Sequence, residues 1–265
     1  MFVTIINDCR DENTMGRQAT RAMHLFKNVI IKTVGIGQSE LEGAGNLIDM
    51  LDASEGDEGV IMVNVAPRYG RGKKWPNGTP FGYFYYGKTL IISTVAEQML
   101  SLAKKFNIAK SLHLTDIPTV VEAMIEKGKL DPELRHRIIN SQFRSYDYMP
   151  RLAKWLIEGV DIPHEEYPFD QVEDVPFAVW WVDNFGNCKT TYLPEEINFR
   201  SGGKIVTKIG ELTCYDRLKD VPDSEAGLIV GSSGLGDRRF LEVVIQGGSA
   251  SEKFGIGVNS RIIDN

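Results

Sequence analysis

The chain has 265 residues, of which 42% are hydrophobic and 25% are charged, and its formal net charge at pH 7 is −6. This length accommodates one large domain or two smaller ones, and this hydrophobic fraction can fill their cores. The mildly acidic balance argues against general nucleic-acid binding, which needs a basic face. No apolar run approaches the roughly 20 residues of a membrane span, so we expect neither a nucleic acid nor a membrane as partner.

The N-terminus and the cysteines indicate the compartment. Residues 2–6 already form a strand-like run, so we expect no signal peptide. Cys9, Cys188 and Cys214 are odd in number and scattered, which is typical of reduced thiols, and we expect a cytoplasmic protein. The four histidines lie far apart in the sequence and none pairs with another at helical spacing, so the sequence does not support a metal site, and we name no metal ligands.

The first third of the chain alternates apolar runs of strand and helix type. Strands are predicted over residues 2–6, 29–34 and 59–65, and helices over residues 16–27 and 41–51, with Ser39 as the N-cap of the second. This order predicts an α/β fold with a largely parallel sheet. An extended segment is predicted over residues 81–86 and further helices over residues 91–106, 119–127 and 130–140.

The later part of the chain changes character. Residues 163–176 are rich in proline and acidic residues and have no periodicity, which indicates a domain boundary. Beyond them, short strands with glycine-rich turns predict a β-barrel-like unit. We therefore expect an N-terminal α/β domain over residues 1–165 and a C-terminal β-barrel domain over residues 174–265.

Chemistry-bearing side chains gather at one strand-to-turn junction. Asp183, Phe185, Gly186 and Asn187 follow the apolar run 177–181. A carboxylate, an aromatic ring and a carboxamide so close together can accept an ammonium, stack on a ring and meet a purine edge. The same residues are also typical of a plain hairpin turn, because Asn and Gly tolerate positive φ.

Several motifs in the same order resemble those of the S-adenosylmethionine hydroxide adenosyltransferases and the related fluorinating and chlorinating enzymes. They are Thr4–Asp8, Leu41–Ala44, Val63–Gly70, Ser141–Ser145, Val182–Asn187, Ser232–Gly234 and Leu241–Ala250. The likeness spans nearly the whole chain and is strongest in its C-terminal third. The resemblance implies displacement at the ribose C5′ carbon of S-adenosylmethionine, with methionine as the leaving group.

The resemblance also implies roles for individual side chains. Asp8 would bind the ribose diol, Asp183 the methionine ammonium, Asn187 the adenine edge, and Phe185 would stack nearby. Ser233, together with Arg238 or Arg239, would bind the methionine carboxylate, since a guanidinium matches a carboxylate in geometry. As alternatives, Asp8 is a turn cap and Arg238 a surface charge.

The chain departs from the family at the water-activating positions. Where water-using members carry Asp, Arg and His, this sequence has Ala66, Lys73 or Lys74, and Arg144. An alanine cannot orient water, and an arginine is too basic to act as a general base near neutral pH. Phe143 and Ser145 match the fluorinating relatives. Together with Lys73 and Arg144 from the water-activating positions, they are the candidate catalytic residues.

Three interpretations of this departure remain open. In the first, Arg68, Arg71, Lys73 or Arg144 makes the pocket electropositive and receives a small anion, or water, as nucleophile. In the second, the protein binds S-adenosylmethionine or adenosine without turnover, as a sensor or a structural subunit. In the third, a similar fold acts on another small molecule.

The resemblance implies a homotrimer with the ligand between one subunit's N-terminal domain and its neighbour's C-terminal domain. S-adenosylmethionine is then substrate or ligand, and no other cofactor is expected. A conventional methyltransferase is disfavoured because residues 7–13, which follow the first strand, contain no glycine.

Overall fold

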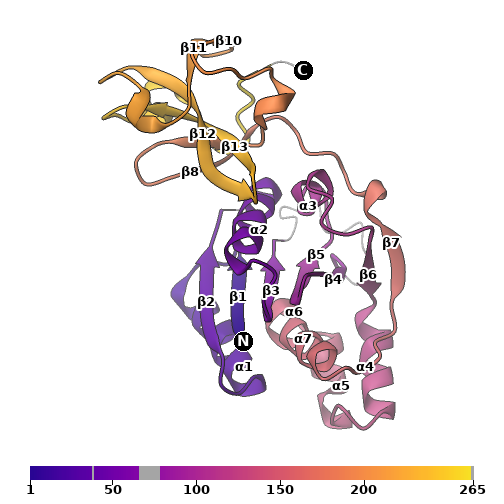
Figure 1. The fold of residues 1–265 in the computed structure, drawn as a ribbon. Helices are drawn as coiled ribbons and strands as arrows, with labels where there is room; N and C mark the ends of the chain where they lie inside the picture. The colour runs from indigo at the N-terminus through magenta and orange to yellow at the C-terminus, as the bar shows by residue number, and fades with distance from the viewer. Residues whose placement is uncertain (38, 66–77, 264–265) are drawn as a thin grey trace.

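A computed structural model of the chain describes residues 1–37, 39–65 and 78–263. It contains two β-sheets, and the C-terminal sheet lies above the N-terminal sheet in Figure 1. The N-terminal sheet has the strand order β2-β1-β3-β5-β4-β6-β7. Strands β2, β1, β3 and β5 pair in parallel, whereas β4, β6 and β7 join by antiparallel pairing. The bounds are β1 (Phe2–Asn7), β2 (Ile30–Gly35), β3 (Gly59–Asn64), β4 (Phe81–Tyr86), β5 (Thr89–Thr94), β6 (Ser111–Thr115) and β7 (Glu165–Pro168).

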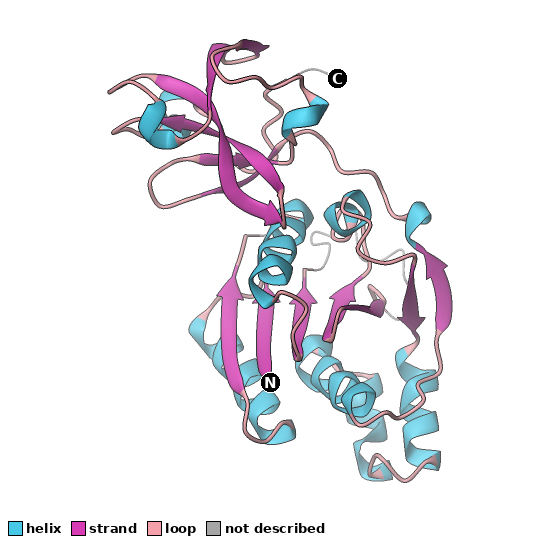
Figure 2. Cartoon of the chain, in the orientation of Figure 1, coloured by secondary structure: helices cyan, strands magenta, loops and turns pink. Residues whose placement is uncertain are grey.

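Helices cover both faces of this sheet (Figure 2). Because successive side chains of a strand point to opposite faces, Ile5 and Ile6 of β1 enter different cores. The core around Ile5 is closed by α1 (Glu12–Leu25), α4 (Ile117–Glu126), α5 (Arg135–Ile139) and α7 (Met149–Ile157), with the short α6 (Arg144–Asp147) before α7. The core around Ile6 is closed by α2 (Glu40–Ser54) and α3 (Ser101–Lys105).

The C-terminal sheet has the strand order β10-β11-β12-β13-β9-β8. All its neighbours are antiparallel except β11 and β12, which pair in parallel. Among the described strands the two end strands, β10 and β8, do not pair with each other. The bounds are β8 (Val179–Val182), β9 (Cys188–Thr190), β10 (Lys204–Thr207), β11 (Gly210–Tyr215), β12 (Ala226–Leu235), β13 (Arg238–Ile245) and α8 (Ala250–Phe254).

Helix α2 lies between the two sheets, in contact with β1 and β3 on one side and with β8 and β12 on the other (Figure 1). Residues 40–48 of this helix are all buried. The ring of Trp180 packs on Gly45 so closely that a Cβ built there would lie 2.1 Å from the ring. Trp180 and Phe240 belong to the same buried cluster as Ile6, so one apolar core runs through both sheets.

The structure confirms the predicted α/β fold with a largely parallel N-terminal sheet and a second, β-rich unit. Ser39 caps α2, accepting a hydrogen bond from the Glu42 amide. The helix predicted over residues 91–106 is wrong in its first part, because residues 89–94 form β5. β5 is buried along its length between β3 and β4, and a short apolar run of this kind has no periodicity that separates strand from helix.

We expect Gly45→Ala to destabilise the protein by about 1–3 kcal/mol or more, because the new methyl group overlaps the buried Trp180 ring. Gly16→Ala is the matched control: Gly16 lies inside α1, and a Cβ there meets nothing within 4 Å. That substitution should stabilise the protein by roughly 0.5–1 kcal/mol. Urea unfolding measures both, and an unchanged midpoint for Gly45→Ala would contradict the tight packing.

Candidate functional site

The carboxyl ends of β1 and β3 carry a buried group of polar side chains. Asn64 donates from Nδ2 to Oδ1 of Asn7 at 2.9 Å, and Asn7 in turn donates to the Cys9 carbonyl at 3.0 Å. The Asp8 amide donates to the Asn64 carbonyl at 3.1 Å. Asp8 is thereby held as a residue that is only 8% exposed, at the carboxyl ends of the strands, where open α/β sheets bind ligands.

Helix α6 brings Arg144 and Ser145 to the same end of the sheet, near the carboxyl ends of the parallel strands. Arg144 donates from Nη1 to the Thr79 carbonyl at 2.9 Å, and its guanidinium lies 5.5 Å from the ring centre of Phe81. Phe81 starts β4 opposite Thr94, the last residue of β5. Burial lowers the pKa of Arg144, yet a guanidinium keeps its proton in proteins. The group is therefore a cation that can attract an anion but cannot take a proton from water.

The neighbours of Arg144 are held from α1. Ser145 is buried and accepts a hydrogen bond from Gln18 Nε2 at 3.0 Å. The ring of Phe143 stacks on Tyr146 with centres 5.4 Å apart, and the Arg17 guanidinium lies 5.1 Å from the Phe143 ring centre. Both of these predicted residues thus have fixed positions set by α1.

The segment between β8 and β9 is a tight turn organised by one carboxylate. Asp183 accepts hydrogen bonds from the Phe185 amide at 2.8 Å, the Asn187 amide at 3.0 Å and the Asn187 side-chain amide at 3.0 Å. Gly186 has φ of +82°, a conformation that favours glycine. The hairpin-turn interpretation is confirmed, and the turn also fixes a carboxylate two residues before Phe185, a residue that is 71% exposed.

Ser233 lies in the joint between the two sheets. Its hydroxyl donates to Asp49 Oδ2 at 2.8 Å and accepts from Lys189, while the Gly234 amide donates to Asp49 Oδ1 at 3.1 Å. Burial raises the pKa of Asp49, an effect that the Ser233 hydrogen bond and the Lys189 charge oppose. Burial also raises the pKa of Glu242, whose carboxylate lies 3.9 Å from Lys189.

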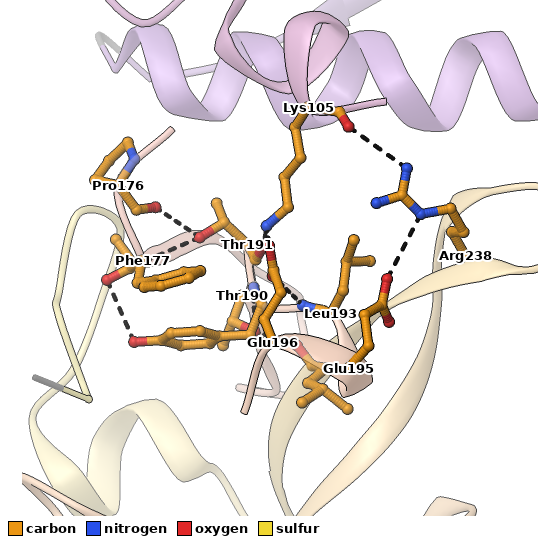
Figure 3. Close-up of polar contacts among 12 residues, drawn as sticks. Lys105, Pro176, Phe177, Thr190, Thr191, Leu193, Glu195, Glu196 and Arg238 are labelled. Atoms are coloured by element: carbon orange, nitrogen blue, oxygen red, sulfur yellow. Dashed lines mark hydrogen bonds and ion pairs between the residues drawn. The ribbon is translucent and has the colours of Figure 1, made fainter. Parts of the chain in front are cut away.

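The two arginines considered for the methionine carboxylate also contact the N-terminal unit of their own chain. Arg239 donates to Asp52 Oδ2 at 2.7 Å. Arg238 donates to the Lys105 carbonyl at 3.4 Å, and its Nε lies 3.6 Å from Glu195 Oε1 (Figure 3). The charge of each is therefore met within the chain.

Lys105 completes the joint on the side of α3. Figure 3 shows its side chain reaching into the segment that follows β9, where Nζ donates to the Thr191 carbonyl and to Glu196 Oε2, both at 2.6 Å. The Lys105 side chain is 8% exposed, and burial lowers its pKa while Glu196 opposes the shift. Hydrogen bonds from both α2 and α3 thus hold the joint together.

The predicted site residues fall into three places. Asp8, Phe143, Arg144 and Ser145 belong to the N-terminal unit, Asp183, Phe185 and Asn187 to the turn, and Ser233 and Arg238 to the joint. In the described part of the chain, every hydrogen bond of the turn stays within the C-terminal unit. The positions of Lys73 and of Ala66, Arg68, Arg71 and Lys74 lie outside the described residues.

Several polar residues at these places were not anticipated from the sequence. Asn7 and Asn64 end neighbouring parallel strands, a signal that could have paired them. Gln18 on α1 and Asp49 on α2 find their partners far away in the chain, and no local pattern predicts such contacts.

Comparison with known proteins identifies the C-terminal unit. The family model described as the SAM (S-adenosylmethionine) hydroxide adenosyltransferase C-terminal domain matches residues 177–263, which include the turn and Ser233. No curated protein matches the chain in sequence. The C-terminal unit is therefore a domain of the SAM hydroxide adenosyltransferase type.

Solved structures extend the likeness in fold to the whole chain. An uncharacterized conserved protein from Thermotoga maritima superposes with a TM-score of 0.68 at 14% identity, over 98% of each chain. A conserved hypothetical protein from Thermus thermophilus superposes with a TM-score of 0.64 at 18% identity, over 98% of this chain and 99% of its own. The family match itself covers the C-terminal unit, as the motifs in that part of the chain predicted, and these structures show that the fold of the whole chain is shared with distant proteins.

None of the helices in the described ranges is both long and apolar enough to cross a membrane.

The raised pKa of Asp49 predicts a pH-dependent effect of Asp49→Asn. A carboxyl whose pKa is higher in the folded than in the unfolded state contributes stability that is lost as the pH rises through the folded value. The variant does not titrate there, so its melting temperature relative to wild type should rise between about pH 4 and about pH 7. Glu242 titrates in both proteins, and loss of the Asp49 charge, which helps to raise the pKa of Glu242, changes the difference in the same direction. Differential scanning calorimetry at the two pH values measures the difference, and a constant or falling difference would contradict the burial of an ionised Asp49.

Proposed function

We propose that this protein binds S-adenosylmethionine and displaces methionine from the ribose C5′ carbon, with water or a small anion as nucleophile. The observation that carries the proposal is the turn of residues 183–187, which lies inside the domain match. Its carboxylate is fixed by three hydrogen bonds next to an exposed aromatic ring. A rigid anion beside a free ring suits a ligand that carries an ammonium group and a purine.

The two halves of the proposed site divide the ligand between them. Asp183 accepts the methionine ammonium, Asn187 meets the adenine edge and Phe185 stacks beside it. On the other half, Asp8 accepts both ribose hydroxyls at the sheet edge. Because the turn makes its hydrogen bonds within the C-terminal unit, we propose that these halves come from neighbouring subunits of a homotrimer.

The reacting end of the proposed site is electropositive. Arg144 stays protonated and Ser145 offers a hydroxyl, so these residues can hold an anionic nucleophile and align it with the C–S bond. A small anion needs no general base, whereas water would need one from elsewhere. Ser233 and Arg238 could bind the methionine carboxylate only by exchanging their present contacts with Asp49 and Lys105.

Incubation with S-adenosylmethionine followed by chromatography tests the reaction. Methionine with adenosine indicates attack by water, and methionine with a 5′-substituted adenosine, formed when halide is added, indicates attack by that anion. Binding without product would contradict the catalytic proposal and favour the alternative of a silent adenosyl-binding protein. Absence of binding would contradict both.

Two substitutions of Asp183 separate its charge from its role in the turn. Asp183→Asn keeps the acceptor for the two backbone amides, and its own amide can pair with a flipped Asn187 side chain. Loss of the charge-assisted bond, worth about 1.5–3 kcal/mol, should weaken S-adenosylmethionine binding roughly 10- to 100-fold. Adenosine lacks the amino-acid group and should bind the variant as it binds wild type.

Titration calorimetry with both ligands decides the assignment. Asp8→Ala is the matched comparison, and it should weaken both ligands alike because both carry the ribose diol. If Asp183→Asn weakens adenosine as much as S-adenosylmethionine, the ammonium assignment is wrong.

Mixed oligomers test the proposed sharing of the site between subunits. Asp8→Ala and Asp183→Asn each damage one half, so oligomers of either variant alone should bind S-adenosylmethionine weakly. Co-expression places some undamaged halves against each other and should restore high-affinity sites in a fraction of the interfaces. A monomer by light scattering, or no restoration in confirmed mixed oligomers, would exclude the shared site.

A further inference from the structure

Three polar side chains and one tyrosine lie on one face at the far edge of the N-terminal sheet. Tyr83 of β4 is paired with His113 of β6, and His113 is paired with Glu166 of β7. His164 stands two residues before Glu166, and side chains at this spacing in an extended segment point to the same face. The sheet register therefore brings together two histidines that are distant in the sequence.

The distances in this group suit a shared cation. One ligand atom from each of His113, His164 and Glu166 can be chosen such that all three lie within 4.8 Å of one another. Nδ1 of His113 lies 3.2 Å from Oε1 of Glu166. Two ligands that are each about 2.0–2.2 Å from one tetrahedral ion lie roughly 3.3–3.5 Å apart, so this pair needs little movement.

Contacts around the group orient both imidazoles as ligands. Nδ1 of His164 lies 2.7 Å from the Ile162 carbonyl and 3.2 Å from the Tyr83 hydroxyl. A carbonyl accepts only from a protonated nitrogen, so this contact leaves the Nε2 lone pair of His164 available. The Tyr83 ring stacks on His113 with centres 4.8 Å apart.

The Nδ1 atom of His113 is a second indication that an ion binds in this group. Its Nδ1 is buried and, among the described residues, has no hydrogen-bond partner. A buried ring nitrogen 3.2 Å from a carboxylate gains a partner when a cation lies between them.

We propose that His113, His164 and Glu166 bind one divalent transition-metal ion of the zinc class, with a fourth position open to solvent. Two imidazoles and one carboxylate are a ligand set that zinc accepts in proteins. None of the three ligands belongs to the proposed adenosyl site, whose Asp8 follows β1, four strands away from β6 in the sheet. The ion ties the edge strand β7 to β6 just before the chain enters the C-terminal unit.

Zinc titration of the metal-free protein tests this proposal by calorimetry and by thermal unfolding. We expect one Zn²⁺ per chain and, at about one hundred times Kd, a melting temperature raised by roughly 5–10 °C. His113→Asn, His164→Asn and Glu166→Gln should each weaken the binding by at least about tenfold. Glu166 is exposed, so its variant folds even if a histidine variant does not.

The matched control is the double variant His24→Asn/His136→Asn, which removes the other two histidines of the chain, both exposed. It should bind Zn²⁺ as wild type does. Binding that survives Glu166→Gln unchanged, binding lost in the control, or no binding below about 100 µM Zn²⁺ would overturn the assignment. Because the readouts are metal affinity and melting temperature, failure of the adenosyl proposal does not affect this test.

Discussion

The packing of Trp180 against Gly45 is the contact on which the arrangement of this molecule depends. Helix α2 serves two sheets at once, and only a residue without a side chain allows the indole ring to reach the helix backbone. The ring and Phe240 then join the apolar cluster that covers one face of the N-terminal sheet. Two sheets that could have been connected by a flexible linker instead share one core.

The shared core explains where the polar residues of the C-terminal unit are used. With the sheets held together, Ser233 faces Asp49, and Arg239 faces Asp52. The turn of residues 183–187 lies outside this joint, and its Phe185 ring remains open to solvent. The domain match covers both places, yet in this chain they differ: one is committed to holding the sheets together, and the other is free to meet a ligand.

Local patterns predicted much of the fold and part of the candidate site. The sequence predicted β1 and β3 from their β-branched runs, and it predicted the cap at Ser39, because each depends on neighbouring residues. The sequence predicted the turn at Asp183 for the same reason. β5 was not predicted, since a buried strand carries no amphipathic period.

Contacts between distant segments explain the rest of what the sequence could not show. Asp49 meets Ser233 across 184 positions of the chain, and nothing near either residue indicates the other. The pairing of His113 with Glu166 depends on β7 joining the sheet beside β6, which requires knowing the strand order. Such sites become visible only when the register of the strands is known.

The core around α2 contains residues from both units, and this has a consequence for synthesis of the chain on the ribosome. The N-terminal sheet and α2 are complete before Trp180, Leu193 and Phe240 have been made, although these residues belong to the same core. Domains generally fold from the N-terminus as they emerge. The nascent protein therefore presents an uncovered apolar helix face until β13 leaves the exit tunnel, a stage at which a chaperone would have a surface to bind.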